Sequence, residues 1–173
     1  MGLFDKLFGK KEEVAPVSND AIISLGTGEV IDVTTVSDAM FAEQMMGKTI
    51  AFQLTDKTVT SPCNGTVEVA FPTGHAFAVR MADGTGILVH IGVDTVSLNG
   101  KGFKMLAKVG QTVKAGQPIV EVNWNTVREA ELDTSTMLIV TEPAEGKEYN
   151  FIVPKQEFGL YNRIGYFLYQ LWQ

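Results

Sequence analysis

The chain has 173 residues, 45% of them hydrophobic, which is enough for one sizeable core but short for two domains. A formal net charge of −6 argues against a nucleic-acid partner, because nucleic-acid binding requires a clustered basic surface. The single cysteine, Cys63, excludes an internal disulfide, and no apolar run approaches the roughly 20 residues that a membrane-spanning helix needs.

The amino terminus carries apolar residues at helical spacing with lysines around them. The apolar residues are Leu3, Phe4, Leu7 and Phe8, and the lysines are Lys6, Lys10 and Lys11. This pattern predicts that residues 1–20 form a short amphipathic element, in weak contact with an anionic membrane surface, followed by a flexible linker. A frayed terminus is the alternative, because so short a helix is marginally stable alone.

Residues 21–153 contain short β-type runs separated by Gly, Asn, Asp and Pro. The expected strands are 21–25, 28–33, 49–54, 65–71, 75–81, 87–91, 116–122, 137–141 and 149–153. Short helical turns are expected at 39–46 and 102–107. Closely spaced strands with turn residues between them are typical of all-β proteins. We therefore predict one domain over residues 21–153, a compact antiparallel β-sandwich or barrel with short helical turns.

The chain has only two histidines, His75 and His90, and each lies in one arm of a predicted hairpin. Asp83-Gly84 between alternating apolar runs predicts a two-residue turn. Such a turn places Phe77 opposite His90, so His75 becomes a diagonal neighbour of His90 on the same face, with backbones roughly 7–8 Å apart. A single bulged residue would instead send the two imidazoles to opposite faces.

Two imidazoles on one sheet face indicate a small set of chemistries. One ring acts as a nucleophile while the other orients it or donates a hydrogen bond, or the two rings supply half of a metal site. Each histidine taken alone is more often a satisfied structural residue. Their predicted proximity favours a functional pair.

The last segment, residues 154–173, is rich in aromatic and leucine residues and has no assigned role. Leu160, Ile164, Phe167 and Leu171 lie at near-helical spacing. Because a contiguous apolar patch is costly to leave in water, we expect this tail to pack on an open sheet edge or to drive self-association.

Three segments carry a resemblance to a known family: 72–77 (PTGHAF), 89–103 (VHIGVDTVSLNGKGF) and 113–118 (VKAGQP). They resemble the glucose-type enzyme IIA of the bacterial phosphoenolpyruvate-dependent sugar phosphotransferase system, over roughly residues 21–122. The resemblance implies an antiparallel β-sandwich and a phosphotransferase component that carries a phosphohistidine. It also implies a cytoplasmic location, peripheral at the inner face of the membrane.

The resemblance further implies the roles of individual residues. His90 would accept a phosphoryl group from the histidine-containing phosphocarrier protein and pass it to a cysteine of a permease IIB domain. His75 would be its partner, and Thr73 would orient His75. No cofactor is implied for this transfer. The chemistry fits, because phosphoryl transfer depends on positioning and charge neutralisation, and a neutral imidazole is a nucleophile near pH 7.

By the same resemblance, a rim of residues around the two histidines would contact partner proteins. Its apolar members would be Met40, Phe41, Met45, Phe71, Leu88 and Val96. Asp38 and Asp94 would accept arginines from the upstream carrier. Family members also bind regulated transporters or kinases, and His75 with His90 would hold Zn²⁺ at such an interface only with a carboxylate from the partner.

The sequence leaves two alternative functions to consider, a lipoyl- or biotinyl-carrier domain and a zinc hydrolase. Residues 113–119 resemble a hairpin of lipoyl- or biotinyl-carrier domains, but these need a lysine at an exposed hairpin tip, and Lys104-Met105 lacks the usual flanks. A zinc hydrolase needs at least three ligands and a base, and two histidines do not supply them.

Overall fold

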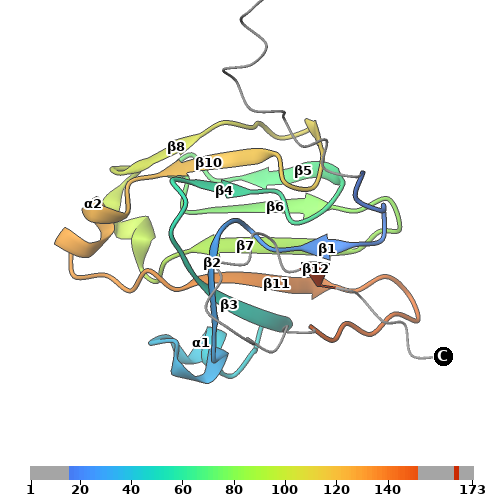
Figure 1. Ribbon diagram of the computed structural model, residues 1–173, viewed down its shortest axis with the longest axis horizontal. Coiled ribbons are helices and arrows are strands. Elements are labelled where there is room, and N and C mark those ends of the chain that lie inside the picture. Colours follow the sequence, from blue (N-terminus) through green and yellow to red (C-terminus); the bar gives the residue numbers. More distant parts are fainter. Residues whose placement is uncertain (1–15, 152–165, 168–173) are drawn as a thin grey trace, which may run out of the picture.

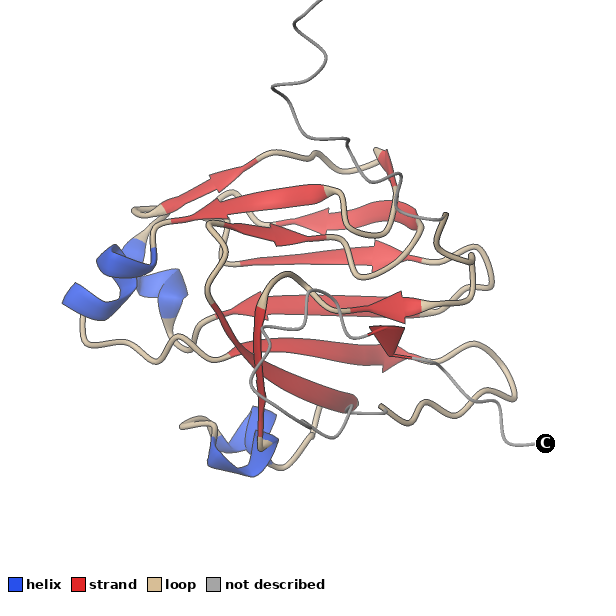
Figure 2. Ribbon diagram, viewed as in Figure 1, coloured by secondary structure: helices blue, strands red, loops and turns tan. Residues whose placement is uncertain are grey.

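The computed structural model describes residues 16–151 and 166–167, and these form a β-structure with short helices (Figures 1 and 2). The larger sheet contains, in spatial order, β2 (Gly28–Ile31), β3 (Lys48–Leu54), β11 (Thr136–Glu142), β7 (Gly86–Ile91), β6 (Ala76–Arg80), β5 (Gly65–Ala70) and β9 (Thr112–Val113). The smaller sheet contains β4 (Thr58–Thr60), β10 (Pro118–Val122) and β8 (Phe103–Met105). A two-stranded pair joins β1 (Ile22–Ile23) to β12 (Tyr166–Phe167).

All the strand pairs of the described residues are antiparallel. The helical segments are short: η1 (Val33–Thr35), α1 (Ala39–Ala42), η2 (Thr95–Leu98) and α2 (Trp124–Glu129). The predicted fold class, an antiparallel β-sandwich with short helical turns, is confirmed.

The main core lies between the two sheets. Phe77 of β6, Val89 of β7, and Ile119 and Val120 of β10 belong to this one cluster, and all four are fully buried. Successive side chains of a strand point to opposite faces. Since Val89 faces the core, its neighbour His90 faces the other side of the large sheet, where its ring is partly exposed.

A second apolar cluster lies on that opposite side of the large sheet, where α1 packs (Figure 1). Its buried members are Val36, Phe41, Ala51, Val93, Met137 and Ile139. Met137 of β11 is the cross-strand neighbour of His90. The second cluster therefore anchors α1 next to the partly exposed imidazole.

The β6–β7 hairpin differs from the predicted register by one residue. The Gly84 N–H donates to the Met81 carbonyl at 3.1 Å, and the Met81 N–H donates to the Thr85 carbonyl at 2.9 Å. Gly84 has φ +94°, so the loop contains three residues, 82–84, in the turn-plus-bulge arrangement in which glycine takes the left-handed position. Ala76, rather than Phe77, therefore lies opposite His90.

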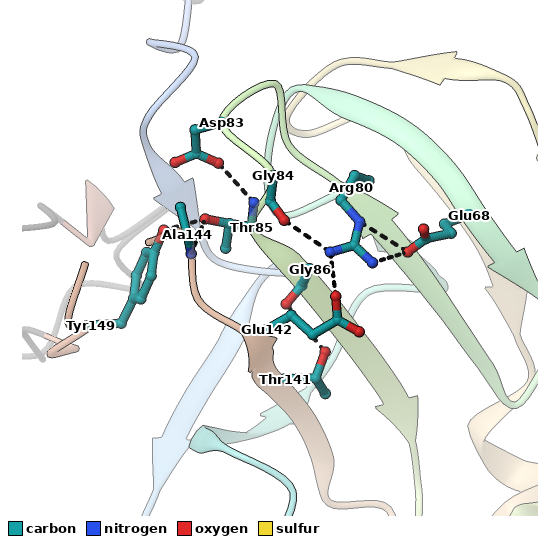
Figure 3. Close-up of polar contacts among 10 residues, drawn as sticks. All are labelled: Glu68, Arg80, Asp83, Gly84, Thr85, Gly86, Thr141, Glu142, Ala144 and Tyr149. Carbon is teal, nitrogen blue, oxygen red and sulfur yellow. Dashed lines mark hydrogen bonds and ion pairs between the residues drawn. The ribbon is translucent and has the colours of Figure 1, made fainter. Parts of the chain in front are cut away.

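The turn end of this hairpin, away from His90, is held by side chains of β5, β6 and β11 (Figure 3). Arg80 of β6 forms ion pairs of 2.6 Å with both Glu68 of β5 and Glu142 of β11, and it donates to the Gly84 carbonyl at 2.8 Å. Single exposed ion pairs contribute little stability, but one guanidinium that joins three strands specifies their alignment at this end.

Several other elements differ from expectation. Residues 103–105, predicted as part of a helical turn, form β8. Phe103 and Met105 pack against the core while Lys104 between them is exposed, which is the alternation of side chains that a strand produces. Residues 149–151, predicted as the start of a strand, are not in one. Helix α2 was missed, although Asn123 caps it by accepting from the Asn125 N–H at 3.2 Å.

The predicted terminal elements lie largely outside the described residues. The amphipathic element predicted at the amino terminus falls mainly on residues 1–15, which are outside the described residues. Of the predicted tail, only 166–167 are described, and they form strand β12 beside β1. Within the described ranges, no helix has the length and apolar character to cross a membrane.

Candidate active site: a pair of histidines

His90 lies near the end of β7, and its ring is held by a backbone carbonyl. Its Nδ1 lies 2.8 Å from the Gly92 oxygen. Because a carbonyl only accepts hydrogen bonds, Nδ1 carries the proton, and in the neutral ring Nε2 carries the lone pair. Gly92 has φ +70°, and a Cβ there would lie 2.5 Å from the Thr95 Cγ2, so glycine is required at this position.

His75 directly precedes β6 and follows Gly74, which has φ +71°. Its Nδ1 lies 2.5 Å from the Thr73 hydroxyl, and the residue is only 7% exposed. With Ala76 opposite His90, strict alternation would send His75 to the other face of the sheet. Because His75 lies outside the regular strand, its side chain instead reaches the His90 side.

The two imidazoles are adjacent. Their ring centroids are 5.3 Å apart, with the planes at 77°. The predicted proximity is therefore confirmed, although the strand register that predicted it is wrong. Phe41 packs 4.9 Å from the His90 ring centroid and Phe71 packs 5.0 Å from that of His75, so each imidazole has an aromatic neighbour.

Burial lowers the pKa of both histidines below the ordinary value. For His75, the proximity of His90 lowers the pKa further. For His90, burial is opposed by the Gly92 hydrogen bond and by the charges of Asp38 and Asp94, and the net pKa is still lowered. Both rings are therefore neutral at pH 7, and the Nε2 lone pair of His90 is available for nucleophilic attack.

We expect both imidazoles to titrate below the ordinary pKa of about 6.5. The unfolded chain then binds protons more readily than the folded protein. The contribution of the two neutral imidazoles to the free energy of unfolding is therefore complete above their pKa in the unfolded chain, and it is lost as the pH falls through their lower pKa in the folded protein. NMR detection of the imidazole nitrogens from pH 8 to pH 4.5, with urea unfolding at the same pH values, measures both effects. A His90 midpoint above the ordinary value would contradict the expectation.

The residues of the predicted rim differ in exposure, and two of them, Phe41 and Phe71, contact an imidazole. Met40 is 48%, Met45 69%, Phe71 40% and Val96 51% exposed. Phe41 is only 6% exposed and Leu88 is half-buried, and both belong to the packing of the second apolar cluster. Phe41 is therefore a buried neighbour of His90 rather than an accessible contact residue, whereas Leu88 keeps part of its surface exposed.

The two predicted acidic residues each precede a short helix, Asp38 before α1 and Asp94 before η2. The Asp38 carboxylate accepts from the Met40 N–H at 2.7 Å and so caps α1. Asp94 is exposed, has φ +58° and precedes η2 without a side-chain capping bond. Both charges act on His90, and the Asp94 carboxylate has no hydrogen bond assigned to it within the described residues.

A backbone group of this site, the Gly92 carbonyl, was not found from the sequence. Its role depends on a hydrogen bond to a side chain two residues earlier, and a carbonyl has no residue-specific signature. The glycine itself, directly after the His90-Ile91 pair, was the available signal.

The site has two of the ligands that a zinc ion needs. Nδ1 of each histidine is occupied by a hydrogen bond, which leaves Nε2 of each ring as a ligand atom. Structural zinc takes four ligands, and the described part of the chain contains no group of three or more His, Cys, Asp or Glu side chains arranged for a metal.

Comparisons with known proteins agree with this geometry. Residues 20–146 match the family described as phosphoenolpyruvate-dependent sugar phosphotransferase system, EIIA 1. The chain is 36% identical over 148 residues to the PTS system glucose-specific EIIA component of Staphylococcus aureus, covering 86% of this chain and 88% of that protein. It is 37% identical over 139 residues to the component of the same name from Staphylococcus epidermidis, covering 80% and 82%.

A solved structure is similar as well. The glucose permease IIA from Mycoplasma capricolum superimposes with a TM-score of 0.71 at 33% identity, covering 75% of this chain and 83% of that one. Sequence, fold and the paired imidazoles thus lead to one conclusion: the chain belongs to the EIIA 1 family of the phosphoenolpyruvate-dependent sugar phosphotransferase system.

Proposed function

We propose that Nε2 of His90 accepts a phosphoryl group from the histidine-containing phosphocarrier protein and passes it to the IIB domain of a glucose-type permease. Membership of the family makes the chain a phosphotransferase component with a phosphocarrier role. The observation that carries the finer proposal is the Gly92 carbonyl, which holds the Nδ1 proton of His90 and leaves Nε2 with the lone pair beside a second imidazole.

In the accepting step, the Nε2 lone pair of His90 forms a bond to phosphorus while the bond from phosphorus to the carrier's histidine nitrogen breaks. The carrier's nitrogen keeps that electron pair. The transition state is loose and its charge lies on the equatorial phosphoryl oxygens, so the protein acts by positioning and by neutralising charge.

We infer that His75, whose ring lies beside that of His90, supplies part of that neutralisation. When the Thr73 hydroxyl donates to Nδ1 of His75, the proton of the neutral ring is on Nε2. This N–H then donates to a phosphoryl oxygen on His90. The negative charge of the phosphoryl group raises the proton affinity of His75, so the interaction strengthens as the phosphoryl group arrives.

The exposed rim suits a protein that meets two partners in turn. Met40 and Met45 are flexible side chains that adapt to different surfaces. Asp38 and Asp94 lie beside the nucleophile and would accept arginine side chains from the upstream carrier.

Reconstitution tests the proposed function. The protein is incubated with phosphoenolpyruvate, enzyme I and the histidine-containing phosphocarrier protein, and the modified residue is then located by mass spectrometry under basic conditions that preserve phosphohistidine. Acid-labile phosphate on His90 is expected. Acid-stable phosphate, or phosphate on another residue, would refute the assignment.

The predicted amphipathic element, outside the described residues, adds a proposal about location: a cytoplasmic protein that touches the inner membrane surface. Deletion of residues 1–11 should leave acceptance from the upstream carrier intact and slow delivery to a permease in anionic vesicles, because apolar burial and lysine attraction are lost. Transfer kinetics in anionic and neutral vesicles measure this. Equal delivery in both, with and without the segment, would show that it is a frayed end.

A further inference from the structure

Asp133 precedes β11 and joins three segments that are distant in sequence. Its Oδ1 accepts from the Ser135 N–H at 2.8 Å. Its Oδ2 accepts from the Ser37 hydroxyl at 2.9 Å and from the Ser37 N–H at 3.4 Å. Its backbone carbonyl accepts from the Val93 N–H at 2.9 Å.

Two of these segments lead directly to His90. Ser37 precedes Asp38, the cap of α1, and α1 carries Phe41, whose ring centroid lies 4.9 Å from that of His90. Val93 follows Gly92, the residue whose carbonyl holds Nδ1 of His90. A Cβ on Gly92 would lie 3.0 Å from the Asp133 carbonyl oxygen, so the two backbones are in close contact.

We propose that Asp133 is a positioning residue for the phosphoryl-accepting histidine. Its carboxylate holds the start of α1, and its carbonyl holds the turn after β7. The aromatic neighbour of His90 and the acceptor of its Nδ1 proton are thereby kept in fixed relation. The inference rests on the proposed function, because it concerns the histidine to which that function assigns the phosphoryl group.

The ionised state of Asp133 suits this role. Burial raises the pKa of Asp133, but the hydrogen bonds from Ser135 and Ser37 outweigh burial and hold the pKa below its ordinary value. An ionised carboxylate only accepts hydrogen bonds, and both Ser37 and Ser135 donate to it.

A purely local role predicts something different. The bond to Ser135 closes a turn within the chain, as aspartates commonly do. The bonds to Ser37 instead cross 96 residues of sequence and reach the element that packs on the imidazole. A local turn former would affect only stability, whereas a positioning residue also changes His90 itself.

The chain offers a matched control in Asp56. Its Oδ2 accepts from the Thr27 N–H at 2.7 Å, and its backbone carbonyl accepts from the Trp124 indole N–H at 2.7 Å. Asp56 thus joins loops in the same way as Asp133, but none of its assigned contacts involves the histidine site.

The experiment compares Asp133→Ala, Asp133→Asn, Ser37→Ala, the double variant Ser37→Ala/Asp133→Asn, and Asp56→Ala. Three quantities are measured in the full chain: the tautomer and pKa of His90 by nitrogen NMR, the rate of phosphoryl acceptance, and the urea midpoint of unfolding. Asp133→Asn and Ser37→Ala keep the proposal testable should Asp133→Ala fail to fold.

We expect Asp133→Ala to reduce the rate of acceptance about tenfold, as for the loss of its two hydrogen bonds to Ser37, each of ordinary strength, and Ser37→Ala about threefold. In both, the tautomer of His90 protonated on Nε2 should become detectable at pH 8. Ser37→Ala and Asp133→Asn should combine less than additively, because they break the same contact. Asp56→Ala should lower the urea midpoint without changing His90.

An unchanged His90 tautomer and pKa in folded Asp133→Asn and Ser37→Ala would overturn the proposal, as would equal effects of Asp56→Ala on His90. The NMR readout does not require phosphorylation. If wild-type protein accepts no phosphate while the His90 tautomer still responds to Asp133, the proposed function fails and the positioning role stands.

Discussion

Replacing His90 by alanine is expected to leave the protein with no acid-labile phosphate after incubation with phosphoenolpyruvate, enzyme I and the upstream carrier. The chain has only two histidines. Nε2 of His90 carries the lone pair, because Nδ1 donates to the Gly92 carbonyl. Removing this nitrogen removes the acceptor itself. Radiolabelled phosphoenolpyruvate, followed by electrophoresis at basic pH, measures the bound phosphoryl group.

The fold should tolerate this change, which makes the result interpretable. The His90 side chain is partly exposed on the side of the large sheet away from the main core, and its cross-strand neighbours Ala76 and Met137 lie within β6 and β11. Circular dichroism and the urea midpoint should therefore remain close to those of the wild type. Undiminished phosphate on a folded His90→Ala protein would sink the assignment of the nucleophile.

Replacing His75 by glutamine is expected to preserve acceptance and to slow transfer to the permease by about 100-fold, the effect of removing one well-placed stabilising group in a transition state. The glutamine amide donates a hydrogen bond to the phosphoryl oxygens, so phosphate is still bound. It cannot take up a proton as the charge changes, whereas the imidazole, held by Thr73, does so. Single-turnover transfer from the phosphorylated variant to a IIB domain measures the loss.

Thr73→Val provides a control that separates orientation from chemistry. It removes the hydroxyl that lies 2.5 Å from Nδ1 of His75 and keeps a side chain of similar shape. Transfer should slow less than in His75→Gln, because the imidazole remains and only its orientation is relaxed.

Onward transfer at the wild-type rate in His75→Gln would show that His75 has no part in the reaction.

Much of the fold was predictable because it is encoded locally. Alternating apolar residues in 75–81 and 87–91 predicted the two strands that carry the site, which the structure has at 76–80 and 86–91, and Asp83-Gly84 located their turn. The number of residues in the turn was not predictable. A two-residue and a three-residue loop are compatible with the same local sequence, so the choice between them depends on contacts outside the hairpin.

Short elements were the least predictable. β8 has three residues and β9 has two, so neither is long enough to show a reliable alternation of apolar and polar side chains. β8 is a strand because Phe103 and Met105 pack against the core and its backbone pairs with β10. Such pairing depends on a segment about fifteen residues further along the chain, beyond the range of any local pattern.

The sequence alone determined which side chains can do chemistry here. Two histidines, with Thr73 close to His75 and acidic and apolar residues nearby, predicted a phosphohistidine site through their types, spacing and resemblance to a known family. These are properties of the residues themselves and survive an error of one position in strand register.

Only the tertiary structure decided how those side chains are arranged. It assigned the His90 proton to Nδ1 through the Gly92 carbonyl, brought His75 beside His90 from outside the regular strand, buried Phe41 against the His90 ring, and joined Ser37 to Asp133. The physical reason is common to all four. A backbone carbonyl has no sequence signature, and hydrogen bonds and burial between distant segments depend on where the whole chain folds, since each requires partners that only the packed sheets bring together.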